Sequence, residues 1–146
     1  MADITFITGS TLGSAEYVAE DLAEISEENG LSAEVLHGPE YTEVTPQGIW
    51  LLVSSTHGAG EIPDNLLAFS ETLAAEKPDL SEVRYGAIGL GNHEYDLFCG
   101  AIRTLDQQLA ALGAKRIGDR LEIDVLVHDV PEDPATEWFR QWITLI

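Results

Sequence analysis

The sequence predicts an α/β fold in which helices cover both faces of a doubly wound parallel sheet. Short apolar runs alternate with amphipathic helical patterns along the chain, and glycine-rich turns follow several of the apolar runs. No repeat or low-complexity linker interrupts this alternation. Parallel strands need crossover connections of about a dozen residues or more, which helices of this length supply. We therefore expect one domain over residues 1–146.

Periodicity and breaker residues give each element its expected bounds. Gly30 and Gly113 are expected to end the first and third helices, because glycine accepts a left-handed conformation at a helix end. Asp133 is expected to cap the last helix, with Pro134 at its first position. Residues 37–48 are rich in proline and glycine and leave room for a short helix. We expect strands at 3–8, 31–36, 49–55, 84–90 and 115–127, and helices at 14–29, 64–77, 98–112 and 133–144.

Charge limits the range of partners. The net charge is −19, and residues 1–76 carry 14 acidic residues and no Lys or Arg. Such a field repels nucleic acid and anionic membranes and attracts a basic protein surface. The alternative is that acidity only keeps the protein in solution.

Cysteine usage and hydropathy indicate a cytoplasmic protein. Cys99 is the one cysteine, so no internal disulfide can form. No apolar run approaches the ~20 residues of a membrane span, and the N-terminus shows no signal-peptide pattern. The four histidines and Cys99 do not have metal-ligand spacing, so we expect no metal site.

The turn after the first predicted strand is the most informative segment. It reads Gly9-Ser10-Thr11-Leu12-Gly13-Ser14, and a helical pattern follows it. Backbone N–H groups and a helix N-terminus make such a turn an anion site, most often for phosphate. The turn lacks the Lys of a Walker loop and the glycine spacing of a dinucleotide fold. Because the first Lys or Arg is Lys77, hydroxyls and amides would hold the phosphate. The alternative is a tight strand-to-helix connection with a Ser or Thr cap.

Two further loops follow the third and fourth predicted strands, where ligands bind in doubly wound sheets. Residues 54–65 contain Gly58 and Gly60, which allow a close approach of the backbone to a flat ligand. Residues 89–99 contain Tyr95, an aromatic side chain placed to lie on a ring.

Together the three loops resemble the flavodoxin family. Gly9 to Glu16 is similar to its phosphate turn, Gly-Ser-Thr-x-Gly-x-x-Glu. The second and third loops resemble the FMN modules of diflavin reductases, through Thr56-x-Gly58-x-Gly60-x-x-Pro63-x-Asn65 and Gly89-Leu90-Gly91-Asn92-x-x-Tyr95-x-x-Phe98-Cys99. Asp124, Asp129 and Trp138 are also similar in spacing.

The resemblance implies a flavodoxin-like, five-stranded sheet in the order 2-1-3-4-5. It is of the short-chain type, because the fifth strand is expected to run without an inserted loop between Lys115 and His128.

The resemblance also implies FMN as the cofactor and a contact for each motif residue. The phosphate would meet the hydroxyls of the first loop and the amides from Leu12 to Ala15. Tyr95 would stack on the outer face of the ring, unless it is only a rim tyrosine. The backbone of Cys99 would contact the flavin, and its side chain is expected to be a small, buried apolar group. The implied FMN contacts are Ser10, Thr11, Leu12, Gly13, Ser14 and Ala15 at the phosphate; Thr56, His57, Gly58, Ala59 and Gly60 at the ring edge; Gly91, Asn92 and Cys99 at the pyrimidine edge; Tyr95 on the ring; and Leu90 and Phe98 beneath it.

Two positions depart from the family pattern. Ala15 stands where a Thr is frequent, which removes one hydroxyl, and His57 stands where a Trp or Tyr often covers the ring. A weaker flavin affinity is therefore expected. The alternative interpretation is that His57 is an exposed loop residue without a special role.

The implied function is one-electron transfer on bound FMN. A separate flavodoxin-type NADPH reductase would supply the electrons, and a basic-surfaced iron–sulfur or haem enzyme would accept them from a monomeric carrier. Acidic residues beside the flavin would lower its potential: Glu61, Asp64, Glu94 and Asp96. The alternatives are a regulatory or adaptor domain without obligatory flavin and a small FMN-dependent quinone reductase. No acid–base constellation beyond His57 supports an enzyme.

Overall fold

The computed structural model describes residues 2–10, 13–56, 60–92, 98–128 and 130–146. The strands are β1 (Ile4–Gly9), β2 (Ala33–His37), β3 (Gly48–Ser55), β4 (Val83–Gly91), β5 (Lys115–Arg116) and β6 (Leu121–Asp124). The helices are α1 (Ser14–Glu28), α2 (Asp64–Glu76), α3 (Gly100–Ala111) and α4 (Glu132–Trp142), with short 3₁₀ turns η1 (Tyr41–Glu43) and η2 (Ile143–Leu145).

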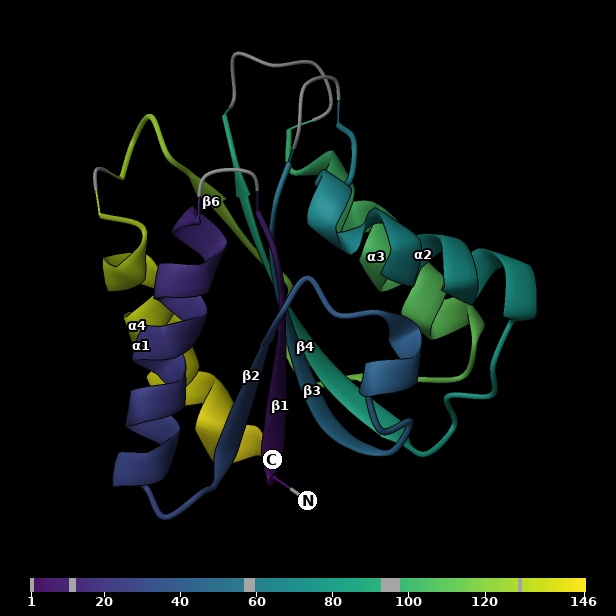
Figure 1. The fold of residues 1–146 in the computed structure, drawn as a ribbon. Coiled ribbons are helices and arrows are strands. Elements are labelled where there is room, and N and C mark those ends of the chain that lie inside the picture. The colour runs from purple at the N-terminus through teal and green to yellow at the C-terminus, as the bar shows by residue number, and fades with distance from the viewer. Residues whose placement is uncertain (1, 11–12, 57–59, 93–97, 129) are drawn as a thin grey trace.

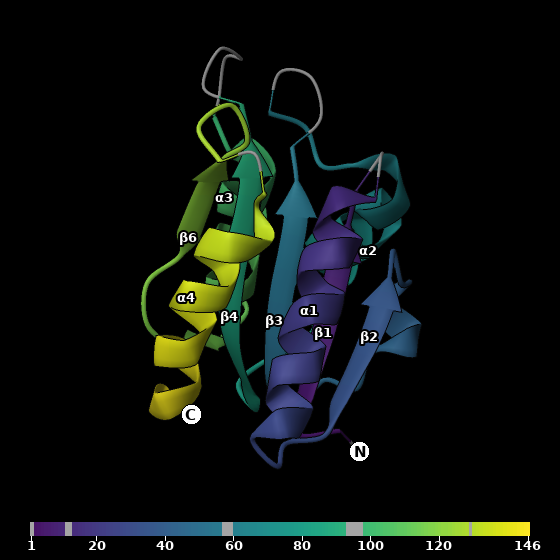
Figure 2. The same ribbon diagram turned by 90° about the vertical axis from the view of Figure 1, so that its left-hand side faces the viewer.

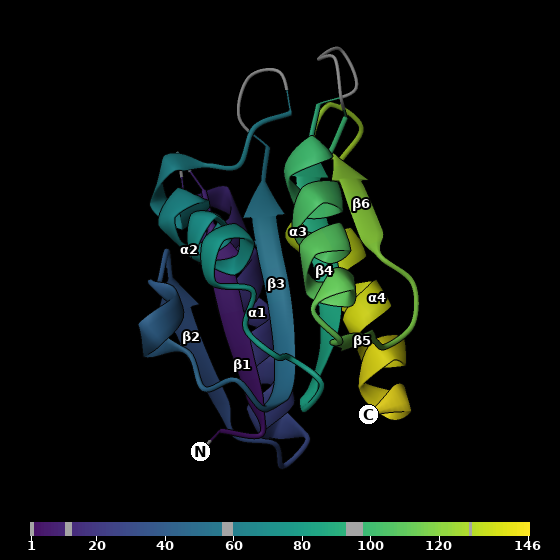
Figure 3. The same ribbon diagram turned by 90° about the vertical axis from the view of Figure 1, so that its right-hand side faces the viewer.

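The strands form one parallel sheet in the order β2-β1-β3-β4-β5, and β6 also pairs with β4. This confirms the expected order. Helices α1 and α4 cover one face, and α2 and α3 cover the other (Figure 1). All strands point the same way, so their carboxyl ends share one end of the sheet (Figures 2 and 3).

The core is split by the sheet, because alternate residues of each central strand face opposite helix layers. On β3, Leu51 packs toward α1 and α4, whereas Trp50 packs toward α2 and α3. On β1, Phe6 and Ile7 divide in the same way. Burial on both faces explains why these strands are continuous apolar runs.

The fifth strand differs from the expected unbroken strand at 115–127. Lys115 pairs with Arg84, but Leu121 pairs with Ile88, so this edge holds two more residues than β4 does between the two pairs. Gly118 lies in the interruption with φ 68°, a conformation that suits glycine. Residues 125–127 form a turn and not the end of a strand. The break is short, and the sheet order of the short-chain type is preserved.

Helix ends show smaller differences. Helix α4 starts at Glu132 with Pro131 at its N-cap, so the predicted cap at Asp133 was wrong. Pro134 is tolerated there because the first N–H groups of a helix have no intrahelical partner. Helix α3 starts at Gly100 and not at residue 98, because Cys99 is left-handed with φ 53°. Gly30 and Gly113 end their helices as predicted, with φ 81° and 101°. The short helix expected within 37–48 is η1.

Among the described residues, no helix is long and apolar enough to cross a membrane.

Candidate functional site

The three predicted loops start at one edge of the sheet. In the sheet register, Gly9 of β1 lies beside Ser54 of β3, and Ser54 lies beside Gly89 of β4. The carboxyl ends of β1, β3 and β4 therefore lie together at one end of the sheet (Figure 3). The fold brings the three sequence motifs to one place, where a doubly wound sheet binds its ligand.

The first loop presents a helix N-terminus. Gly13 is the N-cap of α1 in a left-handed conformation, with φ 84° and ψ 0°, and no side chain of the described residues caps this helix end. The Gly13 N–H donates to Ser10 Oγ over 2.8 Å, which leaves the Ser10 hydroxyl hydrogen for another acceptor. A glycine cap, a hydroxyl donor and the dipole of a 15-residue helix suit a phosphate group.

The remaining residues of this loop divide by burial. Ala15 is fully buried in the core beneath α1, so its backbone amide is what it can offer a phosphate. Ser14 is partly buried at the start of the helix. Thr11 and Leu12 lie outside the described residues. The departure at Ala15 therefore removes a hydroxyl without disturbing the packing of the helix.

Asn65 is a residue of this site to which sequence reasoning gave no role. The Ser10 N–H donates to Asn65 Oδ1 over 3.0 Å, across 55 positions of the chain. Asn65 in turn packs against Gly38, where an added Cβ would come within 2.6 Å of the Asn65 carbonyl oxygen. Gly38 donates its N–H to Thr8 O on β1 over 2.8 Å. Asn65 therefore joins the first loop to α2 and to the end of β2. The only sequence signal was its place in the Pro63-x-Asn65 part of the second motif.

The second and third loops contact each other through backbone and small residues. The Thr56 N–H donates to Leu90 O over 3.0 Å, and the Thr56 hydroxyl accepts from the Ala101 N–H over 3.4 Å. An added Cβ on Gly100 would lie 2.9 Å from Gly60 Cα, so these two glycines allow the loop after β3 to touch the start of α3. The described residues at the ends of the two loops are therefore in contact with each other.

The described residues of the third loop pack closely against one another. Cys99 is fully buried, and an added Cβ on Gly91 would lie 2.9 Å from its Sγ. Burial, with Glu122 nearby, raises the pKa of the Cys99 thiol to about 12, so the thiol stays protonated and acts as a packing group. Leu90 is buried and Phe98 is partly buried against the core. Asn92 is partly buried just beyond β4.

Several predicted contacts lie outside the described residues. They are Thr11, Leu12, His57, Gly58, Ala59 and Tyr95, together with the acidic residues Glu94 and Asp96 and the tail residue Asp129. Glu61 and Asp64, the other two acidic residues expected near the flavin, are exposed at the start of the α2 segment.

An ion cluster around the buried Asp106 links α3 to β4 and to the segment that contains β5. Asp106 on α3 is 5% exposed and accepts from Arg116 and Arg120, each over 2.6 Å, and from the Tyr85 hydroxyl. Burial alone would raise the pKa of Asp106, but the hydrogen bonds from Tyr85, Arg120 and Arg116 outweigh it and hold this pKa below its usual value. Burial, followed by the bond to Asp106, raises the pKa of Tyr85 well above its usual value.

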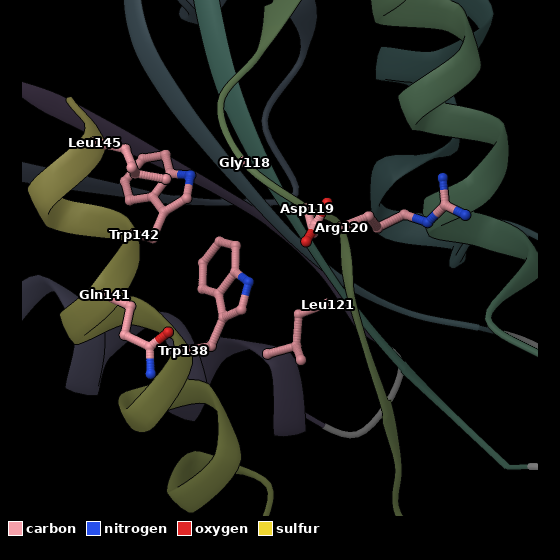
Figure 4. Close-up of a pocket in the computed structure, with 8 residues that line it drawn as sticks. All are labelled: Gly118, Asp119, Arg120, Leu121, Trp138, Gln141, Trp142 and Leu145. Atoms are coloured by element: carbon pink, nitrogen blue, oxygen red, sulfur yellow. The ribbon is translucent and has the colours of Figure 1, made fainter.

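A hollow of about 320 Å³ lies at the strand break, away from the three loops. Trp138 and Trp142 stack in it with ring centroids 5.6 Å apart, and the Trp142 indole N–H donates to Ile117 O over 2.8 Å. Figure 4 shows the Arg120 side chain pointing away from the two tryptophans. The C-terminal half of α4 lines the hollow, at the end of the molecule opposite the carboxyl edge (Figure 2). The hollow is lined by residues of the strand break and of the C-terminal part of the chain, and none of its lining residues belongs to the predicted FMN contacts.

Comparisons with known proteins agree with this geometry. The family model described as Flavodoxin matches residues 7–138. Protein MioC of Escherichia coli (strain K12) is 60% identical over 146 residues, which are 100% of this chain and 99% of that protein. The NADPH sulfite reductase flavoprotein alpha-component of Vibrio cholerae serotype O1 is 35% identical over 146 residues, which are 98% of this chain and 23% of that protein. A cysteine-to-serine mutant of flavodoxin from Pseudomonas aeruginosa has a TM-score of 0.88 at 28% identity, covering 97% of both chains.

The matched range includes all three loops and most of α4. Flavodoxins carry electrons and do not turn over a substrate. The chain therefore belongs to the flavodoxin family, whose cofactor is FMN.

Proposed function

We propose that this chain is an electron carrier that holds FMN at the carboxyl edge of its sheet and passes electrons one at a time between other proteins. The observation that carries the proposal is the first loop. Gly13 and Ser10 provide hydrogen-bond donors at the N-terminus of α1, and Asn65 fixes the Ser10 backbone. Because no Lys or Arg precedes Lys77, hydroxyl and amide donors are the groups on this loop that can hold a phosphate.

Each predicted contact keeps its proposed role toward FMN. Ser10, Thr11 and Ser14, with the amides from Leu12 to Ala15, bind the phosphate and orient the cofactor. Residues 56–60 and Tyr95 enclose the ring and exclude water. The backbone groups of Gly91, Asn92 and Cys99 contact the polar edge of the ring. FMN supplies the one-electron chemistry when bound, and the protein adjusts it by contacts and charge. Because acidic residues near the ring disfavour added negative charge, we expect a low potential.

The proposed partners are proteins. A flavodoxin-type NADPH reductase donates the electrons, in keeping with the NADPH flavoprotein among the relatives. A redox enzyme with a basic surface accepts them, because the net charge of −19 attracts such a surface and repels nucleic acid. The lone Cys99 suits a reducing cytoplasm. We propose a monomeric, single-domain protein in that compartment.

A reconstituted electron-transfer assay tests this function. The chain is loaded with FMN and mixed with NADPH, a purified flavodoxin-type reductase and cytochrome c, a basic haem protein. We expect cytochrome c reduction that depends on the FMN-loaded chain and decreases as salt screens the contact. The same mixture with chain that received no FMN is the control. A rate equal to that of the reductase alone would contradict electron carriage.

A further inference from the structure

The hollow at the strand break contains Trp138, a residue that the proposed function does not use. Its volume of about 320 Å³ falls within the range of small-ligand pockets. The rings of Trp138 and Trp142 stack with an interplanar angle of 19°, and Leu121 and Leu145 add apolar surface. Trp142 is 2% exposed, whereas Trp138 is only partly buried. Trp138 is therefore the indole that a ligand in the hollow can reach.

Contacts within the chain keep the hollow open. Arg120 donates to Asp106 over 2.6 Å and to Glu122 over 3.1 Å, and its guanidinium points away from the tryptophans (Figure 4). Gly118 has φ 68°, and an added Cβ there would lie 3.2 Å from Leu145 Cδ1. The walls are ordered before any ligand binds, which reduces the free-energy cost of binding.

The three tryptophans differ in how they use the indole N–H. Trp50 donates to Thr45 O over 3.1 Å, and Trp142 donates to Ile117 O over 2.8 Å. Trp138 makes no such bond to the residues that the structure describes. Its N–H is therefore a spare donor on an aromatic ring that lines a hollow.

Asp119 supplies an acceptor near this donor. It lines the hollow, is exposed, and has no ion-pair partner within the described part of the chain. Figure 4 shows the Trp138 nitrogen on the side of the indole ring that faces Leu121 and Asp119. The hollow thus combines an aromatic surface with one N–H donor and one carboxylate acceptor.

These features select the chemistry of a ligand. The indole face favours a flat ring, and the Trp138 N–H requires an acceptor on the edge of that ring. The Asp119 carboxylate requires a neighbouring donor and repels phosphate and carboxylate groups. A hydrocarbon ring would leave both polar groups unpaired. Nucleobases stack on aromatic side chains, and adenine carries an amino donor beside a ring-nitrogen acceptor.

We propose that the hollow is a second ligand site, separate from the FMN site, which binds the base of an uncharged aminopurine nucleoside. The base stacks on Trp138, accepts from its N–H and donates its amino group to Asp119. None of these contacts involves a residue assigned to FMN, so the site works with and without bound flavin.

The test is an NMR titration of the ¹⁵N-labelled full chain with adenosine, read at the indole N–H signals and performed with and without FMN. Trp50 is the internal control, because it is fully buried and its N–H is bonded to Thr45 O. Purine riboside is the matched ligand, since it stacks like adenosine but lacks the amino group. Asp119→Ala is the test variant. Glu137→Ala is its control, because Glu137 is exposed beside Trp138 on α4 and does not line the hollow.

We expect adenosine to shift the Trp138 signal in both forms of the chain and to leave the Trp50 signal in place. Asp119→Ala should weaken adenosine binding about tenfold, because a hydrogen bond to a charged acceptor is lost. The same variant should leave the affinity for purine riboside unchanged, and Glu137→Ala should change neither affinity.

An unshifted Trp138 signal at about 10 mM adenosine would overturn the inference. Equal losses of both ligands in Asp119→Ala would also overturn it, because Asp119 would then not contact the amino group. A Trp138 shift that disappears when FMN is bound would place adenosine in the flavin site instead. A shift that follows protein concentration alone would assign the hollow to a second copy of the chain.

Discussion

The Ser10 N–H donates to Asn65 Oδ1 over 3.0 Å, and this bond ties the first loop to the start of α2. Ser10 also accepts from the Gly13 N–H, so its backbone and its side chain are both fixed before any ligand binds. A preformed arrangement reduces the ordering that a bound phosphate would require. Asn65 is thus a positioning residue for the phosphate site and not one of its ligands.

Asn65→Leu should weaken FMN binding about threefold to tenfold, because a single hydrogen bond contributes about 0.5–1.5 kcal/mol. Riboflavin binding should stay the same, since riboflavin lacks the phosphate that this loop is proposed to hold. Isothermal titration with both ligands measures the difference. Asn29→Leu is the control, because the Asn29 amide donates to Ile25 O at the far end of α1. An equal loss for both ligands would show that Asn65 supports the fold and not the phosphate site.

Gly100→Ala should affect the two flavins alike. The added Cβ would come within 2.9 Å of Gly60 Cα, which would push the loop after β3 away from α3. That loop is proposed to meet the ring, so FMN and riboflavin should both lose affinity, by about fivefold or more. Fluorescence titration measures both constants. Retained affinity for both would mean that the contact between the two glycines does not shape the ring site.

Tyr95→Ala tests the proposed stacking on the ring. Stacking of a base on an aromatic side chain contributes ~1–3 kcal/mol, which corresponds to roughly a five- to 150-fold loss of FMN affinity. Circular dichroism of the variant reports whether the fold is intact. An unchanged FMN affinity with an intact fold would remove Tyr95 from the site.

Asp106→Asn should destabilise the protein by about 3 kcal/mol at pH 7, because two arginines would lose their buried partner. The pKa of Asp106 is lowered in the folded state. Its contribution is therefore complete above the unfolded pKa of about 3.9 and is lost as the pH decreases through the lower folded value. The stability difference between wild type and variant should shrink over that acidic range. Urea unfolding at a series of pH values measures it.

Asp79→Asn is the control for this prediction, since Asp79 is exposed and its hydrogen bonds are local ones to Ser81, whose N–H it accepts over 3.0 Å. Its effect on unfolding should be much smaller. A stability difference for Asp106→Asn that is constant from pH 7 to pH 2 would contradict the account of the cluster.

The helices and most strands were predicted from the sequence because they depend on repeating local patterns, whereas the sheet order came from the resemblance to flavodoxins. The strand break was missed because Ile117, Leu121 and Ile123 continue the two-residue alternation of a strand. Only Gly118 marked the two extra residues, and a glycine within a strand has several meanings. The turn at 125–127 was missed because its apolar residues look like the continuation of a strand. The turn is stabilised by the Asp124 side chain, which the apolar pattern does not reveal.

For the candidate site as well, local motifs were predicted from the sequence and contacts between distant residues were not. The three loops were found because each is a contiguous motif at the end of a strand. The role of Asn65 was not found, because its partner Ser10 is 55 positions away and no local pattern encodes the pairing. The buried cluster was missed likewise, since Asp106, Tyr85 and the pair Arg116 and Arg120 come from three separate segments.

The most direct test of the phosphate site compares FMN with riboflavin on the flavin-free chain, at low and high salt. Two or more hydrogen bonds to a charged phosphate predict that FMN binds at least about 100-fold more tightly. Because the first loop has no Lys or Arg, FMN affinity should not decrease steeply with salt, and screening of the net charge of −19 should strengthen it. Equal affinities for the two flavins would contradict the assignment of the loop from Ser10 to Ala15 as a phosphate site.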